Sequence, residues 1–575
     1  MAQAHHEINF ESYITQQLVK NGWLEGKAEN YDKQRALYPE DVLAWIKETQ
    51  PEKWRKLEAL NGDDTANVVL SRLAKALDLK KQGGTINIFR QGFSIPGAGL
   101  IEMSGDVPED DRNEAVKAKY QANRLRVVEV KTDFTQSIDD AIEQYKKDRL
   151  PVDPASKRKE PLLTFKRGAI VHFAMSDSEI YMTTKLDGDN SFFLPFNQGN
   201  HGRAGNAARI DGEYPVAYFW EQILQPDSWL RIFHSFVYVE TANKMNAQGH
   251  PYKKETLIFP RYHQWEAVNL MIEDAKKNSA GMQYLCEHSA GSGKTSTIAW
   301  VSHDLIRLRT PEGKPYFDSV IIVTDRNVLD AQLQEAVQQI DHQFGVIDAI
   351  DRKKTGDSKS KQLAKALIAG TPIIVVTIQT FPYAMQAILT EQSLNDKKFA
   401  VIIDEAHNSQ TGSTAQGLRA ALTLDSKDKM EDMTVEELLT QVQQSRVRPN
   451  NVSYFAFTAT PKHSTMTLFG RNNSEGLPQS FHRYTMRQAI DEGFILDVLE
   501  NYTPYKTALH LSSQIEDDKR VDKKQARKSL AKWLSLHPTN VTQKVEFIIE
   551  HFRANVSHLL NGEAKAMVVT SSRAA

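Results

Sequence analysis

The chain has 575 residues, of which 40% are hydrophobic and 25% are charged, and its formal net charge is −2. A chain of this length exceeds one hydrophobic core, so about three domains are expected. The single cysteine, Cys286, excludes a disulfide framework and a cysteine-based zinc site. The near-zero net charge leaves nucleic-acid binding open, because any DNA contact would come from local basic patches.

No apolar run reaches the length of a membrane span, and Met1–Phe10 lacks the apolar region of a signal peptide. A cytoplasmic protein without membrane contact is therefore expected.

The N-terminal third is expected to mix helices with short strands. Residues 8–60 carry apolar side chains at helical spacing, and Val68–Leu79 predicts a further helix. After the Gly83-Gly84 pair, the alternating residues Thr85–Phe89 predict a strand. The glycine- and asparagine-rich segment 197–206 predicts a surface loop. Residues 240–258 are expected to link this part to the next domain.

A nuclease-type pair of side chains lies in the second half of the apolar strand predicted at residues 124–131. Glu129 and Lys131 lie two residues apart, so they share one face of that strand. A helix is expected from about 136 to 149. In such a setting the Glu129 carboxylate can hold Mg²⁺, and Lys131 can orient the attacking water and stabilise charge on phosphorus. An exposed ion pair at a strand edge explains the same tripeptide, and is the commoner case when nothing else supports a site.

A phosphate-binding loop is indicated where the apolar run Tyr284–Cys286 meets a helical segment. Glycines let successive N–H groups point at one anion, and the helix N-terminus adds partial positive charge. Lys294 can reach the β- and γ-phosphates, and the Thr295 hydroxyl can ligate Mg²⁺. His288 stands where the usual pattern has a glycine, and a glycine-rich turn with a chance Lys-Thr is the alternative. The expected nucleotide contacts are Ser289, Ala290, Gly291, Ser292, Gly293, Lys294, Thr295 and Ser296.

Apolar, β-branched runs alternate with helical stretches through the rest of this region, which predicts a parallel sheet covered on both faces. The expected strands are 283–286, 319–324, 372–377, 399–403 and 453–457.

Acidic residues follow the strand at 399–403. Ligands of parallel sheets bind outside the carboxyl ends of the strands, so Asp404 and Glu405 are expected beside the phosphate loop. Asp404 would hold Mg²⁺ through water, and Glu405 would polarise the attacking water. A helix N-cap with a first-turn acid is the alternative for this pair.

Hydroxyl groups follow two other predicted strands. Thr458 and Thr460 could link the Asp404 site to the next domain, although a plain strand end is the alternative. Thr380 could bind a nucleic-acid phosphate, and a helix cap explains that residue equally well.

Two charged segments lie further on. Residues 425–450 predict a helical insertion on the surface, and the basic face of 517–533 is interpreted as a solvated helix rather than a DNA contact. A last strand is predicted at Ala566–Arg573, after which the sequence given stops, so a second motor domain is expected to be incomplete.

The segments HSAGSGKTSTIAW, TDRNVLDAQL, TIQTF, DEAH and FTATP together resemble a superfamily 2 helicase motor. With YQANRLRVV, EVKTDFTQSIDDAIEQYKKDR and FLPFNQGN near the N-terminus, the chain more narrowly resembles the restriction subunit of type I restriction-modification enzymes. The resemblance covers nearly the whole chain.

The resemblance implies a multi-domain α/β protein. A PD-(D/E)xK nuclease-like domain is expected over 1–245, a RecA-like ATP-binding motor domain over 246–475, and the start of a second RecA-like domain over 476–575. It implies ATP and Mg²⁺ as cofactors, and double-stranded DNA and the modification and specificity subunits as partners. The expected activity is ATP-driven DNA translocation with cleavage.

For single residues, the resemblance implies nuclease roles for Glu129 and Lys131, hydrolysis by Asp404 and Glu405, coupling by Thr458 and Thr460, and adenine recognition by Gln264. Gln264 could instead be a surface helix residue.

The chain departs from the family pattern at three points. The metal-binding Asp of a strand before Glu-x-Lys has no counterpart, Gln-x-x-x-Tyr reads Ala141-x-x-x-Tyr145 with Gln144 displaced, and the helicase arginine motif is not reached. Impaired cleavage and weak ATP hydrolysis are expected for this chain.

Two alternatives remain open. One is a stand-alone superfamily 2 helicase or remodeller with a non-catalytic N-terminal module. The other is a non-enzymatic scaffold that only docks DNA or partners.

Overall fold

The computed structural model describes most of the chain and divides it into two compact units, Met1–Gln488 and Ala489–Ala575. The described residues are 2–79, 83–108, 112–128, 137–245, 250–324, 336–337, 347–349, 359–377, 381, 384, 387–388, 391–404, 451–497, 545, 548–558 and 564–568.

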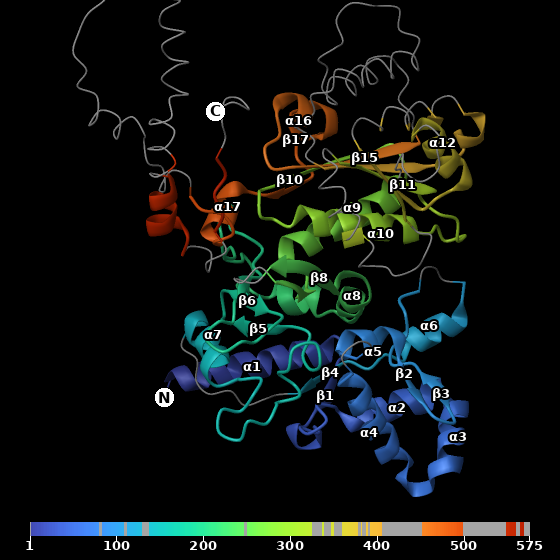
Figure 1. The fold of residues 1–575 in the computed structure, drawn as a ribbon, viewed down its shortest axis with the longest axis vertical. Coiled ribbons are helices and arrows are strands. Elements are labelled where there is room, and N and C mark those ends of the chain that lie inside the picture. The colour runs from blue at the N-terminus through green and yellow to red at the C-terminus, as the bar shows by residue number, and fades with distance from the viewer. Residues whose placement is uncertain are drawn as a thin grey trace, which may run out of the picture. The chain divides into compact units, whose positions relative to one another are not determined.

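The N-terminal part combines helices with short strands (Figure 1). Its elements are α1 (Ala2–Lys20), β1 (Leu24–Gly26), α2 (Pro39–Thr49), α3 (Pro51–Asn61), α4 (Thr65–Leu77), α5 (Thr85–Gln91), β2 (Phe93–Ile95), β3 (Gly99–Ile101), α6 (Glu114–Gln121), β4 (Arg126–Val128), α7 (Ile138–Lys147), β5 (His172–Met175), β6 (Ile180–Thr183), β7 (Leu194–Pro195), α8 (Pro226–Arg231), β8 (Tyr238–Met245) and β9 (Pro251–Ile258).

Two features favour helices α2, α3 and α4: the residues at the starts of α2 and α3, and an apolar face that each of the three helices buries. Pro39 and Pro51 each occupy the first turn of a helix, where a missing N–H is harmless. The three helices bury Trp45, Trp54 and Leu73 in one shared core. Full burial of such a side chain stabilises the fold by about 1.5–3 kcal/mol.

The strand expected at Thr85–Phe89 is wrong, because these residues form the helix α5. Ile86 and Ile88 alternate as in a strand, yet each is buried in a different core, on either side of the helix. The Thr85 hydroxyl donates a hydrogen bond to the carbonyl of Gly168 at 2.7 Å and thereby fixes the helix start. Tertiary packing on two sides overrides the local pattern.

The short strands of this part pair in small sheets. β1 pairs with β4 in parallel, whereas β2–β3, β5–β6–β7 and β8–β9 are antiparallel. Of the segment expected as a link, 240–258, residues 240–245 and 251–258 therefore belong to the antiparallel pair β8–β9.

The following part of the unit is built on a sheet of seven strands among the described residues, all parallel, in the order β12-β13-β11-β14-β15-β10-β18. This confirms the expected mixed α/β fold with a parallel sheet. Its elements are α9 (Tyr262–Asn278), β10 (Gln283–His288), α10 (Lys294–Arg307), β11 (Ser319–Thr324), β12 (Ile347–Ala349), α12 (Lys359–Ala369), β13 (Ile373–Thr377), β14 (Phe399–Asp404), β15 (Val452–Thr458), α16 (His463–Phe469), β16 (Arg471–Asn472), β17 (Pro478–Gln479), β18 (His482–Tyr484) and α17 (Met486–Asp491).

Both faces of this sheet are covered, which is why its strands read as continuous apolar runs. Tyr284 and Cys286 point into the core that contains α9 and α10, whereas Leu285 points into the core that contains α12 and α16. The helices α9 and α10 are drawn on one side of the strands and α12 and α16 on the other (Figure 1).

The larger of these cores continues into the N-terminal part. Phe236 and Tyr238, which precede the sheet, pack on Trp300 of α10 with ring centroids 5.3 and 6.2 Å apart. β18 lies beyond the boundary expected at 475 but pairs with β10. The domain division at 245 and 475 stays a prediction.

The strand expected at Ala566–Arg573 is not formed over the part that the structure describes, residues 566–568. A strand needs a hydrogen-bonded neighbour, and no described residue pairs with this segment. The expected features at 425–450 and 517–533 lie outside the described residues. None of the helices described combines the length and apolar character that crossing a membrane requires.

Candidate nucleotide-binding site

The loop between β10 and α10 has the backbone that the sequence predicted. Gly291 and Gly293 have φ angles of 72° and 77°, in the left-handed region that side chains disfavour. Gly293 is the N-cap of α10, so the helix begins directly at Lys294. The loop therefore turns tightly and delivers the free N–H groups of a helix N-terminus to one place.

Hydrogen bonds within the loop fix its curvature. The N–H of Ser292 donates to the carbonyl of Ser289 at 3.3 Å, and the N–H of Thr297 to that of Gly293 at 3.2 Å. The ammonium of Lys294 folds back to the carbonyl of His288 at 3.4 Å.

Burial divides the loop residues into two groups. Ser289 and Ser292 are buried and hold the loop against the protein, whereas Ala290, Gly291, Gly293 and Thr295 are exposed. Lys294 and Ser296 are half-buried. The exposed group is accessible to a ligand.

Two further predicted residues lie at the same edge of the sheet. Phe457 pairs with Cys286 of β10 on one side and with Asp404 of β14 on the other. Asp404 is thus level with Cys286, two residues before the end of β10, and two strand spacings away from it, roughly 10 Å at the usual spacing. Thr458 follows Phe457 on the strand between them and is buried.

Of the other predicted site residues in this part of the chain, Thr460 is described and two are not. The exposed Thr460 donates its N–H to the hydroxyl of Thr458 at 3.3 Å, which keeps both threonines at the end of β15. Glu405 and Thr380 lie outside the described residues.

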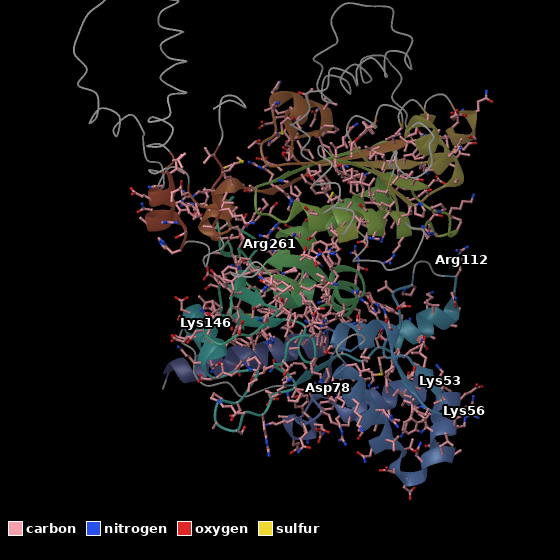
Figure 2. All side chains as sticks on the ribbon, in the orientation of Figure 1. Lys53, Lys56, Asp78, Arg112, Lys146 and Arg261 are labelled. Carbon is pink, nitrogen blue, oxygen red and sulfur yellow. The ribbon has the colours of Figure 1, made fainter. Side chains whose placement is uncertain are left out.

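The start of α9 binds the phosphate loop through three side chains. Arg261, which is labelled in Figure 2, donates to the carbonyl of Gly291 at 2.8 Å, and Gln264 donates to that of Gly293 at 3.0 Å. Between them, Nε2 of His263 lies 3.0 Å from the carbonyl of Ser292. Sequence reasoning singled out Gln264 and missed the other two. The signal that could have indicated Arg261 and His263 is the presence of polar residues at the start of a helix. The structure shows that this helix start is buried.

Gln264 is buried and uses both ends of its amide inside the protein. Its oxygen accepts the N–H of Arg261 at 2.9 Å, as in a capping box, while its nitrogen binds the loop. A Cβ on Gly293 would lie 2.4 Å from that nitrogen, so the approach requires glycine. A surface position is wrong for Gln264, and adenine recognition stays a prediction.

Buried imidazoles surround the loop. Nε2 of His288 lies 2.8 Å from Nδ1 of His482, whose Nε2 lies 3.1 Å from a carboxylate oxygen of Glu266. Burial lowers the pKa of His263 and His288 well below the ordinary value, so both are neutral at pH 7. In the described part of the chain no cluster of histidine, cysteine or acidic side chains could hold a metal ion.

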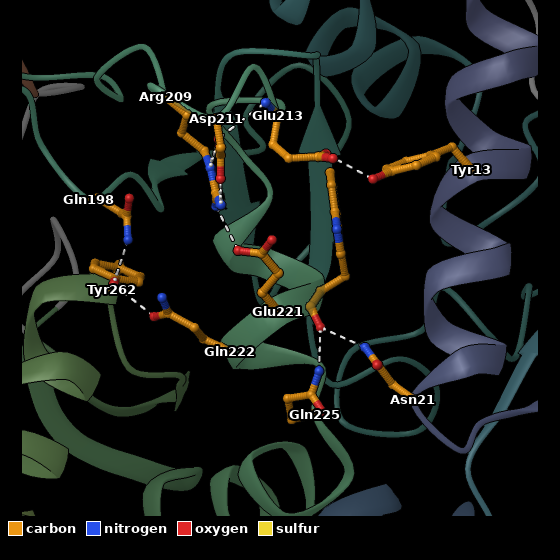
Figure 3. Close-up of polar contacts among 11 residues, drawn as sticks. Tyr13, Asn21, Gln198, Arg209, Asp211, Glu213, Glu221, Gln222, Gln225 and Tyr262 are labelled. Carbon is orange, nitrogen blue, oxygen red and sulfur yellow. Dashed lines mark hydrogen bonds and ion pairs between the residues drawn. The ribbon is translucent and has the colours of Figure 1, made fainter.

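The N-terminal part contacts the start of α9. Gln198 donates to the hydroxyl of Tyr262 at 2.8 Å, and this hydroxyl donates to Gln222 at 3.2 Å (Figure 3). The hydroxyl of Thr485 donates to the carbonyl of Gly202 at 2.5 Å. The segment 197–206, expected at the surface, is therefore partly packed against the sheet-bearing part.

The expected nuclease residues Glu129 and Lys131 lie outside the described residues, directly after β4. β4 itself is held by Asp41 of α2, which accepts hydrogen bonds from Arg124 at 2.8 Å and Arg126 at 2.6 Å. Burial acts to raise the pKa of Asp41, but the two guanidinium groups outweigh it and hold the pKa below its usual value.

The parallel sheet and the helices on both of its faces define an α/β protein. Residues 263–532 match the SWI2/SNF2 ATPase family. A solved Sulfolobus solfataricus SWI2/SNF2 ATPase core in complex with dsDNA is 16% identical, with a TM-score of 0.22, over 37% of this chain and 36% of that chain.

Over 302 residues the chain is 27% identical to the Type I restriction enzyme SsaAORF53P endonuclease subunit of Staphylococcus saprophyticus, covering 52% of this chain and 27% of that protein. Over 346 residues it is 24% identical to the Type I restriction enzyme HindI endonuclease subunit of Haemophilus influenzae, covering 56% and 28%. The matches thus span about a quarter of the length of these relatives. The chain is thus similar to type I restriction enzyme endonuclease subunits, and its residues 263–532 match an ATPase family, which confirms the resemblance expected from its motifs.

Proposed function

We propose that the chain acts in a type I restriction endonuclease as the subunit that translocates DNA at the expense of ATP and cleaves it. Double-stranded DNA and the modification and specificity subunits are its proposed partners. The observation that carries the proposal is the convergence of the phosphate loop, Asp404 and Thr458 at one edge of the sheet. The relatives named above are endonuclease subunits of type I restriction enzymes, which is why we assign this edge of the sheet to such an enzyme.

The loop residues fit a nucleotide triphosphate. The exposed residues of the loop are accessible to a ligand, the left-handed glycines turn its backbone tightly, and Lys294 folds back over the loop. In the proposal Lys294 binds the β- and γ-phosphates, while Thr295 and Asp404 hold Mg²⁺. When bound, Mg²⁺ neutralises phosphate charge. Glu405 polarises the attacking water.

The remaining roles follow the motif order. Thr458 and Thr460 couple the Asp404 site to the next domain, and Thr380 binds a DNA phosphate. Glu129 and Lys131 perform cleavage in a nuclease-like domain over 1–245, which precedes a motor domain over 246–475 and the start of a second one over 476–575.

The nucleotide part of the proposal is tested by Lys294→Ala. Loss of the Lys294 ammonium, which the proposal places on the β- and γ-phosphates, is expected to abolish detectable binding of a fluorescent ATP analogue in the presence of Mg²⁺. Lys277→Ala, at an exposed position in the last turn of α9, is the matched control and should bind as the unaltered chain does. Equal affinity of the Lys294→Ala variant would contradict the assignment.

The cleavage part is tested by Mg²⁺-dependent nicking of plasmid DNA in the presence of the partner subunits. Nicking that disappears in Lys131→Ala supports the restriction role. The match of residues 263–532 to the SWI2/SNF2 ATPase family favours a stand-alone remodeller as the second candidate. DNA-stimulated ATP turnover without any nicking would support that candidate instead.

A further inference from the structure

We infer that His263, flanked by Arg261 and Gln264, is a positioning residue that holds the phosphate loop in its ligand-binding conformation. The inference rests on the proposed nucleotide binding at this loop. It assigns to the start of α9 a contact with the loop backbone rather than with a nucleobase.

The three contacts follow the loop residue by residue. Arg261, His263 and Gln264 bind the carbonyls of Gly291, Ser292 and Gly293 in that order, at 2.8, 3.0 and 3.0 Å. One turn of helix thus holds three successive carbonyls on the side that faces α9.

Fixing these carbonyls also fixes the amides that a phosphate needs. A peptide unit is planar and trans, so its N–H points opposite to its C=O. With the carbonyls of Ser292 and Gly293 held toward α9, the N–H groups of Gly293 and Lys294 point away from it. A flipped peptide would present an oxygen to an anion instead of a donor.

His263 is the central member because its geometry is fixed from both sides. A carbonyl only accepts, so Nε2 of His263 must carry the proton in this contact. The imidazole stacks on the ring of Tyr484, with centroids 3.8 Å apart and planes inclined by 17°. The carbonyl of Tyr484 accepts the N–H of Ser289 at 3.0 Å, so the same residue also holds the start of the loop.

Adenine recognition by Gln264 and positioning of the loop predict different losses of ligand affinity in the variants. A residue that reads the base affects ATP but not inorganic triphosphate, which lacks a base. A residue that holds the loop affects both ligands by the same factor. Competition of ATP and of inorganic triphosphate against a fluorescent ATP analogue therefore separates the two roles.

The experiment uses the full chain and two variants at the central position. His263→Phe keeps a ring that can stack on Tyr484 but lacks the donor, and should weaken both ligands by about tenfold, as for one lost hydrogen bond. His263→Gln supplies an N–H at similar reach and should restore both affinities to within about threefold. Gln264→Met should weaken ATP and triphosphate alike.

The matched control is His303→Phe. His303 is also buried, with Nε2 2.7 Å from the carbonyl of Val337, but it lies away from the loop on α10. This variant should lose a similar amount of thermal stability while its ligand affinities stay unchanged.

Each outcome decides the inference. Unchanged affinities in His263→Phe, a loss confined to ATP, or a His263→Gln variant as weak as His263→Phe would overturn it while nucleotide binding stands. An unaltered chain that binds neither ligand would overturn the proposed function and the inference together.

Discussion

The hydroxyl of Tyr238 on β8 lies 3.1 Å from the hydroxyl of Ser296 in the first turn of α10. Ser296 follows Lys294 by two positions, so this contact reaches the helix that carries the phosphate loop. Nearby, the indole N–H of Trp300 donates to the carbonyl of Phe236 at 2.9 Å. The chain just before and within β8 therefore braces α10 from the side of the N-terminal part.

Removing the Tyr238 hydroxyl should loosen this brace. Burial raises the pKa of Tyr238 to about 12, so the hydroxyl keeps its proton at neutral pH. Tyr238→Phe is expected to lower the free energy of unfolding by about 1 kcal/mol, the net value of one hydrogen bond, as measured by chemical denaturation. Tyr252→Phe, at an exposed position of the same hairpin, should leave the stability unchanged. Equal losses in the two variants would contradict a specific role for the contact.

A side chain at Gly293 should be destabilising. Its φ angle of 77° disfavours alanine, and the added Cβ would lie 2.4 Å from the amide nitrogen of Gln264. Gly476 has nearly the same φ, 79°, with no heavy atom within 4 Å of such a Cβ, so Gly476→Ala measures the backbone strain alone.

We expect Gly476→Ala to lose about 1 kcal/mol in the free energy of unfolding, and Gly293→Ala to lose more because the steric clash adds to the strain. Only Gly293→Ala should weaken nucleotide binding. Equal stability losses for the two substitutions would show that the Gln264 contact yields without a penalty.

The sheet could be predicted because its strands are buried on both faces. A run such as Ser319–Thr324 is buried throughout and apolar from Val320 to Val323, and the strand order places the ends of β10 and β14 on one edge. Ligands of a parallel sheet bind outside the carboxyl ends of its strands. From this rule the sequence could predict that the loop and Asp404 lie at the same edge of the sheet.

Contacts between side chains and backbone carbonyls were not accessible in the same way. The bonds of Arg261 and His263 to the loop depend on where α9 packs, which no local spacing encodes. For α5 the local pattern was misleading, since Ile86 and Ile88 serve two cores. Both misses arise from tertiary packing rather than from propensity.

His172 on β5 should make stability depend on pH in the acid range. Burial, reinforced by the charge of Arg149, lowers the pKa of this imidazole from 6.5 to about 4. Between pH 6.5 and about 4, the His172 imidazole therefore binds a proton in the unfolded chain but stays neutral in the folded chain. The stabilising contribution is complete above pH 6.5 and is lost as the pH falls from there through about 4.

In that interval one proton corresponds to a slope of up to about 1.4 kcal/mol per pH unit in the free energy of unfolding. His172→Phe keeps a ring beside Tyr145, whose ring centroid lies 5.6 Å from that of His172, and should flatten the slope by this amount. Chemical denaturation at a series of pH values measures it. His201→Ala, at an exposed position in the segment 197–206, should retain the slope of the unaltered chain. A His172→Phe variant with an unchanged slope would mean that other buried groups, such as His234, govern the acid dependence.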